Sequence, residues 1–158
     1  MEEGAGTAWL ADGIAAGGVA AVLSGIPSTV IAVARGDDPL EATAAAGSVL
    51  VSDESGKLFR LAAAVPVHVA ISLGWAVILS ALLPRRATIA WGAAAGLCIA
   101  ALDLGVIGQR FARIRALPLG PQIADHAAYG AVVGAALRKR RARFANSPRE
   151  SALSRTHV

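Results

Sequence analysis

Residues 61–84 read LAAAVPVHVAISLGWAVILSALLP, an uncharged stretch that lies between Arg60 and Arg85. The stretch contains 24 residues. An α-helix rises about 1.5 Å per residue, so about 20 apolar residues are enough to cross the roughly 30 Å hydrocarbon core of a bilayer. This stretch therefore predicts a transmembrane helix over about residues 59–84.

Charged side chains divide the rest of the chain into three more segments of similar length. These segments hold 22, 23 and 22 residues, and they lie between Asp12 and Arg35, between Arg86 and Arg110, and between Arg115 and Arg138. We expect further transmembrane helices near residues 9–34, 88–109 and 119–137. The pattern predicts an all-α, polytopic membrane protein whose core is a four-transmembrane-helix bundle.

The composition of the 158-residue chain agrees with this class. Apolar residues make up 55% of the chain, charged residues 16%, and the mean hydropathy is +0.57. Soluble domains carry about 25% charged residues.

The single cysteine, Cys98, excludes an intramolecular disulfide and is interpreted as a small packing residue. The sequence contains no motif of a hydrolase, a zinc protease, a P-loop enzyme or a dinucleotide-binding enzyme, so we expect no enzymatic activity.

A fifth helical segment is too short to cross a bilayer. Asp38 and Pro39 are typical of the N-cap and first turn of a helix, and the uncharged residues 42–52 that follow number only 11. We predict a short helix over residues 39–51 that is interfacial or re-entrant. The transmembrane domain then covers residues 1–138, and residues 139–158 form a basic tail that we expect to be disordered and cytoplasmic.

The distribution of basic residues predicts the orientation in the membrane. With four spans, the basic residues after Leu137 share one side with Arg85 and Arg86, which gives nine on that side and six on the other. This bias favours a multi-pass protein of the cell membrane with both termini in the cytoplasm. The cluster after the last span is predicted to anchor the helix to lipid headgroups rather than to bind nucleic acid, because no aromatic residues interleave with the charges. Its members are Arg138, Lys139, Arg140, Arg141 and Arg143.

Small residues at four-residue spacing mark helix faces that can pack closely. Such faces let neighbouring backbones approach one another inside a membrane. The predicted helix-packing residues are Gly13, Gly17, Gly25, Gly92, Gly96, Gly130 and Gly134. We also expect Pro27 to bend the first span.

Ionisable residues within the predicted spans converge on one depth. Asp103 lies near the end of the third span, Asp125 and His126 lie near the start of the fourth, and His68 lies near the start of the second, with Ser72 one turn further on. Because a charged residue is costly in hydrocarbon, we predict that these five form one polar intramembrane cluster. The cluster could provide interhelical hydrogen bonds, relay protons or ions, or hold a metal or haem. No HxxxH or CxxC spacing supports the last alternative, so no metal or other cofactor is predicted.

Residues 67–75 (VHVAISLGW), 101–105 (ALDLG) and 124–126 (ADH) resemble stretches of small four-span bacterial integral membrane proteins of unknown function. The resemblance covers about residues 10–138 and implies a four-span fold without an assigned activity. Four short spans are also similar to small multidrug-resistance transporters, but the membrane-embedded glutamate of their first span is missing here.

These observations lead to two functional hypotheses. The first is a non-enzymatic packing or accessory protein that associates with the lipid bilayer and with either a second copy or another membrane protein, through a Gly-rich face left exposed on the first span. The alternative is a small transporter or ion-conducting protein that uses the intramembrane histidines and aspartates.

Overall fold

The computed structural model describes the backbone of residues 3–154 and the side chains of residues 7–143, and within these residues it is all-helical. The α-helices are α1 (Glu3–Leu23), α2 (Ile26–Arg35), α3 (Glu41–Gly47), α4 (Lys57–Leu82), α5 (Thr88–Leu102), α6 (Ala112–Arg115) and α7 (Leu119–Ser154). A π-helical turn, η1 (Asp103–Ile107), and a 3₁₀ turn, η2 (Gly108–Arg110), continue α5.

Three helical segments are long and apolar enough to cross a membrane. They are Thr7–Arg35, Lys57–Leu82 and Thr88–Arg110, with 29, 26 and 23 residues. Their limits lie within two residues of those predicted from the spacing of charges. The prediction of transmembrane helices is confirmed for these three segments.

The predicted fourth span, residues 119–137, is helical but forms only part of α7. The polar residues Gln122, Asp125 and His126 lower its hydropathy, and it is not among the three segments above. The helix does not end near Leu137 as predicted, because its backbone continues to Ser154. Arginine, lysine, alanine and glutamate, which are strong helix formers, dominate this continuation.

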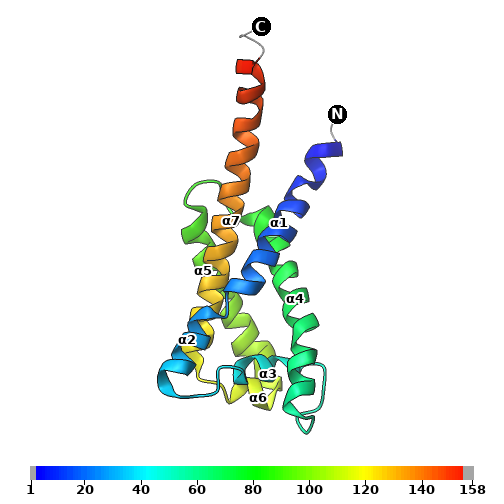
Figure 1. Ribbon diagram of the computed structural model, residues 1–158, viewed down its shortest axis with the longest axis vertical. Helices are drawn as coiled ribbons and strands as arrows, with labels where there is room; N and C mark the ends of the chain where they lie inside the picture. The colour runs from blue at the N-terminus through cyan, green and yellow to red at the C-terminus, as the bar shows by residue number, and fades with distance from the viewer. Residues whose placement is uncertain (1–2, 155–158) are drawn as a thin grey trace.

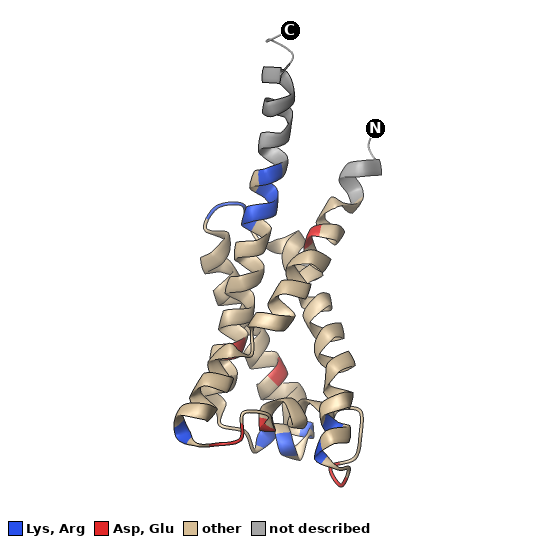
Figure 2. Cartoon of the chain, viewed as in Figure 1, with Lys and Arg blue, Asp and Glu red and all other residues tan. Residues whose placement is uncertain are grey.

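The long helices lie side by side, with α1 packed between α4 and α7, and α7 packed on its other side against α5 (Figure 1). The start of α1, the end of α7 and the loop between α4 and α5 lie at one end of the bundle, which we call the terminal end. The opposite end, which we call the loop end, holds α3 and α6. Basic residues gather at both ends, and the helices between them are largely uncharged (Figure 2).

Glycines allow the closest contacts between helices. A Cβ on Gly92 or Gly96 would collide with backbone atoms of α7, and one on Gly130 or Gly134 would collide with backbone atoms of α5. Gly13 and Gly17 pack in the same way against α4, so the small-residue face of the first span is used inside the chain rather than left exposed. Gly25 is an exception, since a Cβ there would meet nothing within 4 Å. Its prediction as a packing residue is therefore wrong.

The first span is broken instead of bent. Regular α-helix stops at Leu23 and resumes at Ile26, and Pro27 is the second residue of the new helix. A proline has no N–H to donate and its ring clashes with the carbonyl four residues earlier, which is that of Leu23. By contrast, α4 passes Pro66 without interruption.

Candidate functional site

Asp103 and His126 form a pair between α5 and α7. The Nε2 atom of His126 lies 3.4 Å from Oδ2 of Asp103, and the two side chains are only 21% and 20% exposed. Gly96 positions them, because it lets α5 approach the backbone of His126. The predicted convergence of these two residues is therefore present in the structure.

The other ring nitrogen of His126 fixes where the protons of the pair lie. Nδ1 is 2.8 Å from the carbonyl oxygen of Gln122, one turn earlier in α7. A carbonyl only accepts, so Nδ1 carries a proton and donates it. If Nε2 carried no proton, its lone pair would face the Asp103 carboxylate at 3.4 Å, which is an unfavourable arrangement. The arrangement therefore favours one exchangeable proton held between Nε2 and Oδ2.

Asp125 interacts with a different helix. Its Oδ1 accepts a hydrogen bond from the backbone N–H of Ser28 at 2.8 Å. Ser28 is the third residue of α2, where a helix has amides without intrahelical acceptors and a partial positive charge. A carboxylate from α7 thus caps α2 from outside, in the manner of an N-cap side chain.

His68 lies on the other side of the same break. Its Nε2–H donates to the carbonyl of Ala21 at 2.8 Å. In an unbroken helix this carbonyl would accept from the amide of Gly25, which instead lies in the break. Two residues predicted for the cluster, His68 and Asp125, therefore satisfy backbone groups on either side of the interruption in the first span.

Ser72 contributes through its backbone. The hydroxyl of Tyr129 donates a hydrogen bond to the Ser72 carbonyl, while the Ser72 side chain is buried where Gly17 of α1 meets α4. Tyr129 follows Asp125 by four residues on α7. This bond links α4 to α7 directly above the ionisable residues, on the side of the terminal end.

The five predicted residues lie in one region but do not bond to each other as one network. In the described part of the chain, Asp103 and His126 are paired, whereas Asp125, His68 and Ser72 contact the backbone of the first span or Tyr129. Sequence reasoning missed the backbone partners at Ala21, Ser28 and Gln122. Pro27 was the available signal, because a proline inside a span releases backbone groups that need other partners.

The backbone at Asp103 is also irregular. Asp103 is the first residue of the π-helical turn that ends α5. Single π-turns within α-helices are rare and occur frequently at functional sites. Two departures from regular helix, this turn and the break in the first span, therefore flank the ionisable residues.

A cavity of about 430 Å³ opens near the loop end, between α2, α3, α6 and α7. Its lining includes Ser28 and Gln122, whose backbone groups bond to Asp125 and His126, and the charged residues Asp37, Glu41 and Arg113. We call it the vestibule. It places polar surface next to both hydrogen-bond partners of the site.

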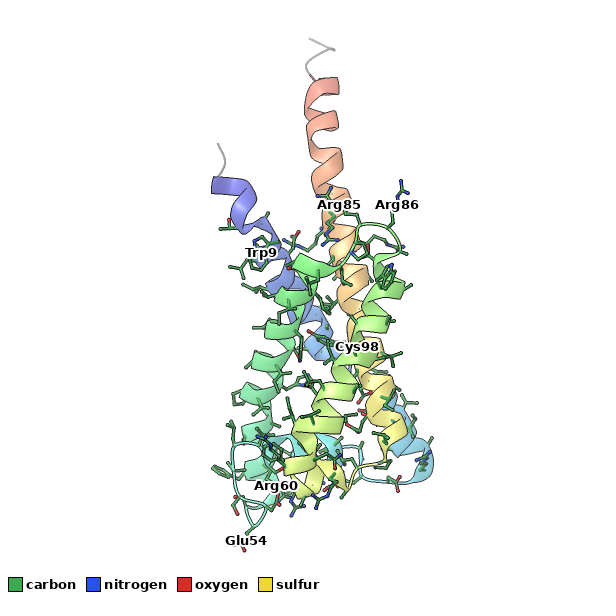
Figure 3. The ribbon with its side chains drawn as sticks, turned by 180° about the vertical axis from the view of Figure 1, so that it is seen from behind. Trp9, Glu54, Arg60, Arg85, Arg86 and Cys98 are labelled. Carbon is green, nitrogen blue, oxygen red and sulfur yellow. The ribbon has the colours of Figure 1, made fainter. Side chains whose placement is uncertain are left out.

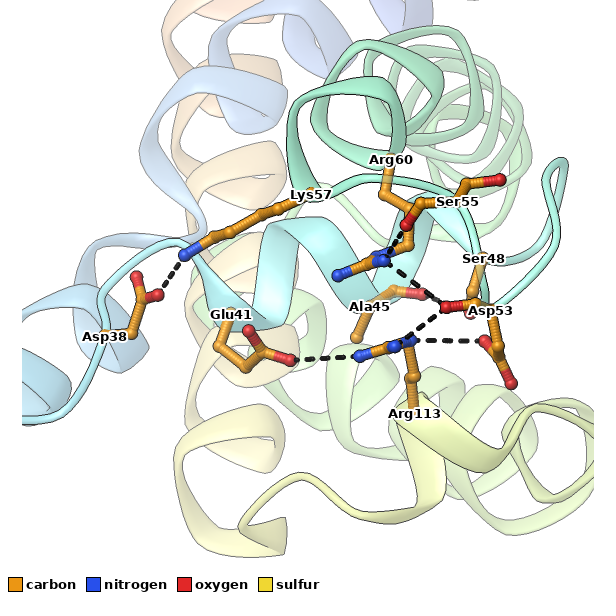
Figure 4. A network of polar contacts seen from close by, with 9 residues as sticks. All are labelled: Asp38, Glu41, Ala45, Ser48, Asp53, Ser55, Lys57, Arg60 and Arg113. Atoms are coloured by element: carbon orange, nitrogen blue, oxygen red, sulfur yellow. Dashed lines mark hydrogen bonds and ion pairs between the residues drawn. The ribbon is translucent and has the colours of Figure 1, made fainter.

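Charged residues at the loop end hold the short helix α3 in place (Figure 4). Arg113 of α6 contacts Glu41 at 3.8 Å and Asp53 at 3.4 Å. The buried Arg60 donates to the carbonyl of Ser55. Lys57 pairs with Asp38, and this hydrogen bond, together with one from the Leu40 amide, lowers the pKa of Asp38.

At the terminal end, two of the five predicted headgroup anchors have partners within the chain. Arg140 pairs with the buried Asp12 at 2.6 Å. Arg141 donates to the carbonyls of Ser80 and Leu83 at the end of α4. Both residues face α1 and α4, whereas Arg138, Lys139 and Arg143 are exposed. That these five residues anchor the helix to lipid headgroups stays a prediction.

No group of three or more His, Cys, Asp and Glu side chains within residues 7–143 is arranged to hold a metal ion. Comparison of the chain with protein-family models, curated proteins and solved structures gave no match. The resemblance to small four-span membrane proteins stays an expectation.

Proposed function

We propose that the protein is a four-span integral membrane protein with α7 as its fourth crossing, α3 at the membrane interface, and both termini in the cytoplasm. The packing of α7 along α5 and α1 supports this count, since α7 lies among three apolar helices. Its polar residues face those helices: Asp125 contacts α2, His126 contacts α5 and Tyr129 contacts α4. A span shielded in this way needs less hydropathy than one that faces lipid on all sides.

Within this architecture, we propose proton transport across the membrane, centred on Asp103, Asp125 and His126. The observation that carries the proposal is the His126–Asp103 pair: Nδ1 donates to Gln122, and Nε2 lies 3.4 Å from Oδ2 of Asp103, where the two atoms can share one proton. Ionisable groups inside membrane helices are costly and commonly mark proton or ion pathways. Broken helices whose termini face a charged group are a recurrent feature of transporter sites.

The vestibule supplies access to this site from the loop end. A proton that arrives there meets Ser28 and Gln122, behind which lie Asp125 and His126. Towards the terminal end the bundle is filled by apolar side chains, among them Leu79, Val133 and Leu137. In this proposal a proton passes Ser28 and Gln122 to reach the site from the loop end, and transport requires a second conformation that opens the terminal end. The break between α1 and α2 is a hinge at which such a movement can occur.

Proton flux into liposomes tests the proposal. Asp103→Asn and Asp125→Asn preserve side-chain shape and hydrogen-bond acceptors but cannot ionise, so both should fold and should reduce flux at least tenfold. Glu54→Gln is the matched control, because Glu54 lies on an exposed loop at the loop end (Figure 3) and its variant should conduct normally. Full flux in both asparagine variants would exclude the site from transport.

A second function, association with a second copy or another membrane protein, is supported by a different observation. The helices α4 and α5 are consecutive but do not pack extensively against each other in the described chain. Large side chains on them, such as Val65, Trp91 and Leu97, are 61%, 58% and 48% exposed. A partner that covers this side would make the protein an accessory or oligomeric component.

Native mass spectrometry in mild detergent distinguishes the two functions. The accessory function predicts a stable dimer or co-purified partner that Trp91→Ala weakens and Asp125→Asn leaves intact. The transport function predicts that Asp125→Asn reduces proton flux, whereas Trp91→Ala does not. A monomer without proton flux would contradict both.

A further inference from the structure

A groove of about 630 Å³ lies at the terminal end, at the opposite end of the bundle from the vestibule. It is formed by the first turns of α1, the end of α4, the loop after it and one turn of α7. Its lining residues are Ala8, Trp9, Asp12, Ser80, Ala81, Leu82, Leu83, Pro84, Arg85 and Arg141. Neither the intramembrane site nor the proposed proton path uses it.

The charges around the groove leave an excess of positive charge. Asp12 is the single carboxylate of the lining, and Arg140 neutralises it at 2.6 Å. Neither Arg85 nor Arg141 has a carboxylate within ion-pair distance among the described side chains. The groove therefore attracts an anion.

Arg141 is held in position by the end of α4. Its two terminal nitrogens donate to the carbonyls of Leu83 and Ser80, at 3.1 and 2.8 Å. These bonds use two of the five N–H groups of a guanidinium. An oriented guanidinium with further N–H groups is suited to phosphate, because its planar donors match two phosphate oxygens at once.

The groove also has an apolar wall at the level of the membrane interface. Trp9 is 43% exposed and lies on the same end of the bundle as Arg85 (Figure 3). Tryptophan favours the boundary between headgroups and acyl chains. Leu82, which is 73% exposed, also lines the groove and adds to this apolar wall. A ligand with an anionic head and an apolar tail fits such a surface better than a soluble anion does.

We propose that this groove binds the headgroup phosphate of an anionic phospholipid, with Arg85 and Arg141 on the phosphate and Trp9 beside the glycerol and upper acyl chain. The proposal stands apart from proton transport, since it rests on different residues at the other end of the bundle.

Native mass spectrometry of the purified chain with phosphatidylglycerol or phosphatidylcholine tests this site. The wild type should bind one phosphatidylglycerol at least tenfold more tightly than phosphatidylcholine. Arg85→Gln should raise the dissociation constant for phosphatidylglycerol about fivefold, the effect of one basic residue near an anionic headgroup. Arg86→Gln is the matched control, because Arg86 is the next residue of the same exposed loop and does not line the groove. It should change the constant less than twofold.

Three outcomes would overturn the proposal. Equal binding of the two lipids would show that the groove does not recognise anionic headgroups. Equal losses in the Arg85 and Arg86 variants would show diffuse attraction to the basic end. Displacement of the lipid by an equal concentration of inorganic phosphate would assign the groove to a soluble anion.

Discussion

The half of the bundle near the terminal end and the half near the loop end differ in how their backbone is satisfied. Near the terminal end, regular helices pack through Gly13, Gly92, Gly130 and Gly134, and side chains bond to the backbone mainly where α4 ends, at Ser80 and Leu83. Near the loop end, the first span is broken and α5 ends in a π-turn. His68 and Asp125 supply the hydrogen bonds that the broken helix lacks. Polar side chains in a membrane are therefore concentrated where the helices are irregular, which is also where a hinge and a proton site can coexist.

The largest expected effect comes from disturbing the close packing of the terminal half. Gly130→Val should destabilise the protein by about 3 kcal/mol, because the added atoms would meet the backbone of α5, which cannot rotate away as a side chain does. Gly18→Val should change stability by less than about 0.5 kcal/mol, since Gly18 has nothing within 4 Å of its Cβ position. Unfolding titrations in mixed micelles measure both, and equal effects would refute the proposed packing of α5 on α7.

The ion pair between Asp12 and Arg140, at the terminal end, should give the next largest effect on stability. Asp12→Ala leaves Arg140 half-buried without its carboxylate, which should cost about 2 kcal/mol, less than for a fully buried pair because the Arg140 side chain is 35% exposed. Adding Arg140→Ala should recover part of this loss. Additive losses in the double variant, measured by the same titrations, would show that the two residues do not interact.

Capping of α2 in the loop half should contribute less. Asp125→Ala should cost about 1 kcal/mol, the usual value for removing an N-cap acceptor, and should speed hydrogen exchange of the Ser28 amide. Asp125→Asn keeps an acceptor oxygen and should stay within about 0.5 kcal/mol of the wild type. Unchanged Ser28 exchange in the alanine variant would argue against the cap.

The smallest expected effect is the pH dependence of the stability of the loop before α3, at the loop end. The pKa of Asp38 is lowered in the folded protein by its bond to Lys57, so the pair stabilises the loop before α3 above the unfolded pKa of aspartate. This contribution is lost as the pH falls through the lowered folded pKa. Hydrogen exchange of the Leu40 amide should therefore accelerate on acidification, relative to neighbouring amides. The acceleration should be absent in Asp38→Asn, and its persistence there would assign it to another group.

How far the sequence predicts this structure also differs between the two halves. The spacing between charges was enough to locate three membrane-compatible helices, because length and hydropathy are local properties. The same spacing predicted that Asp103 and His126 lie close together, because both are near the same interhelical loop. The partners of Asp125 and His68 could not be predicted, because they are backbone groups released by a break whose position depends on tertiary packing. For the same reason, the bonds that Arg140 and Arg141 make within the chain could not be predicted.

The ¹⁵N NMR spectrum of the His126 ring, recorded in bilayers with His68 and His157 replaced by glutamine, tests the proton site most directly. Nδ1 should keep its proton throughout the titration, because it donates to the Gln122 carbonyl, and Nε2 should exchange the single proton that it shares with Asp103. Asp103→Asn should change the titration of Nε2 and leave Nδ1 protonated. A neutral ring with its proton on Nε2 and none on Nδ1, or a titration that Asp103→Asn does not alter, would contradict the proposed proton site.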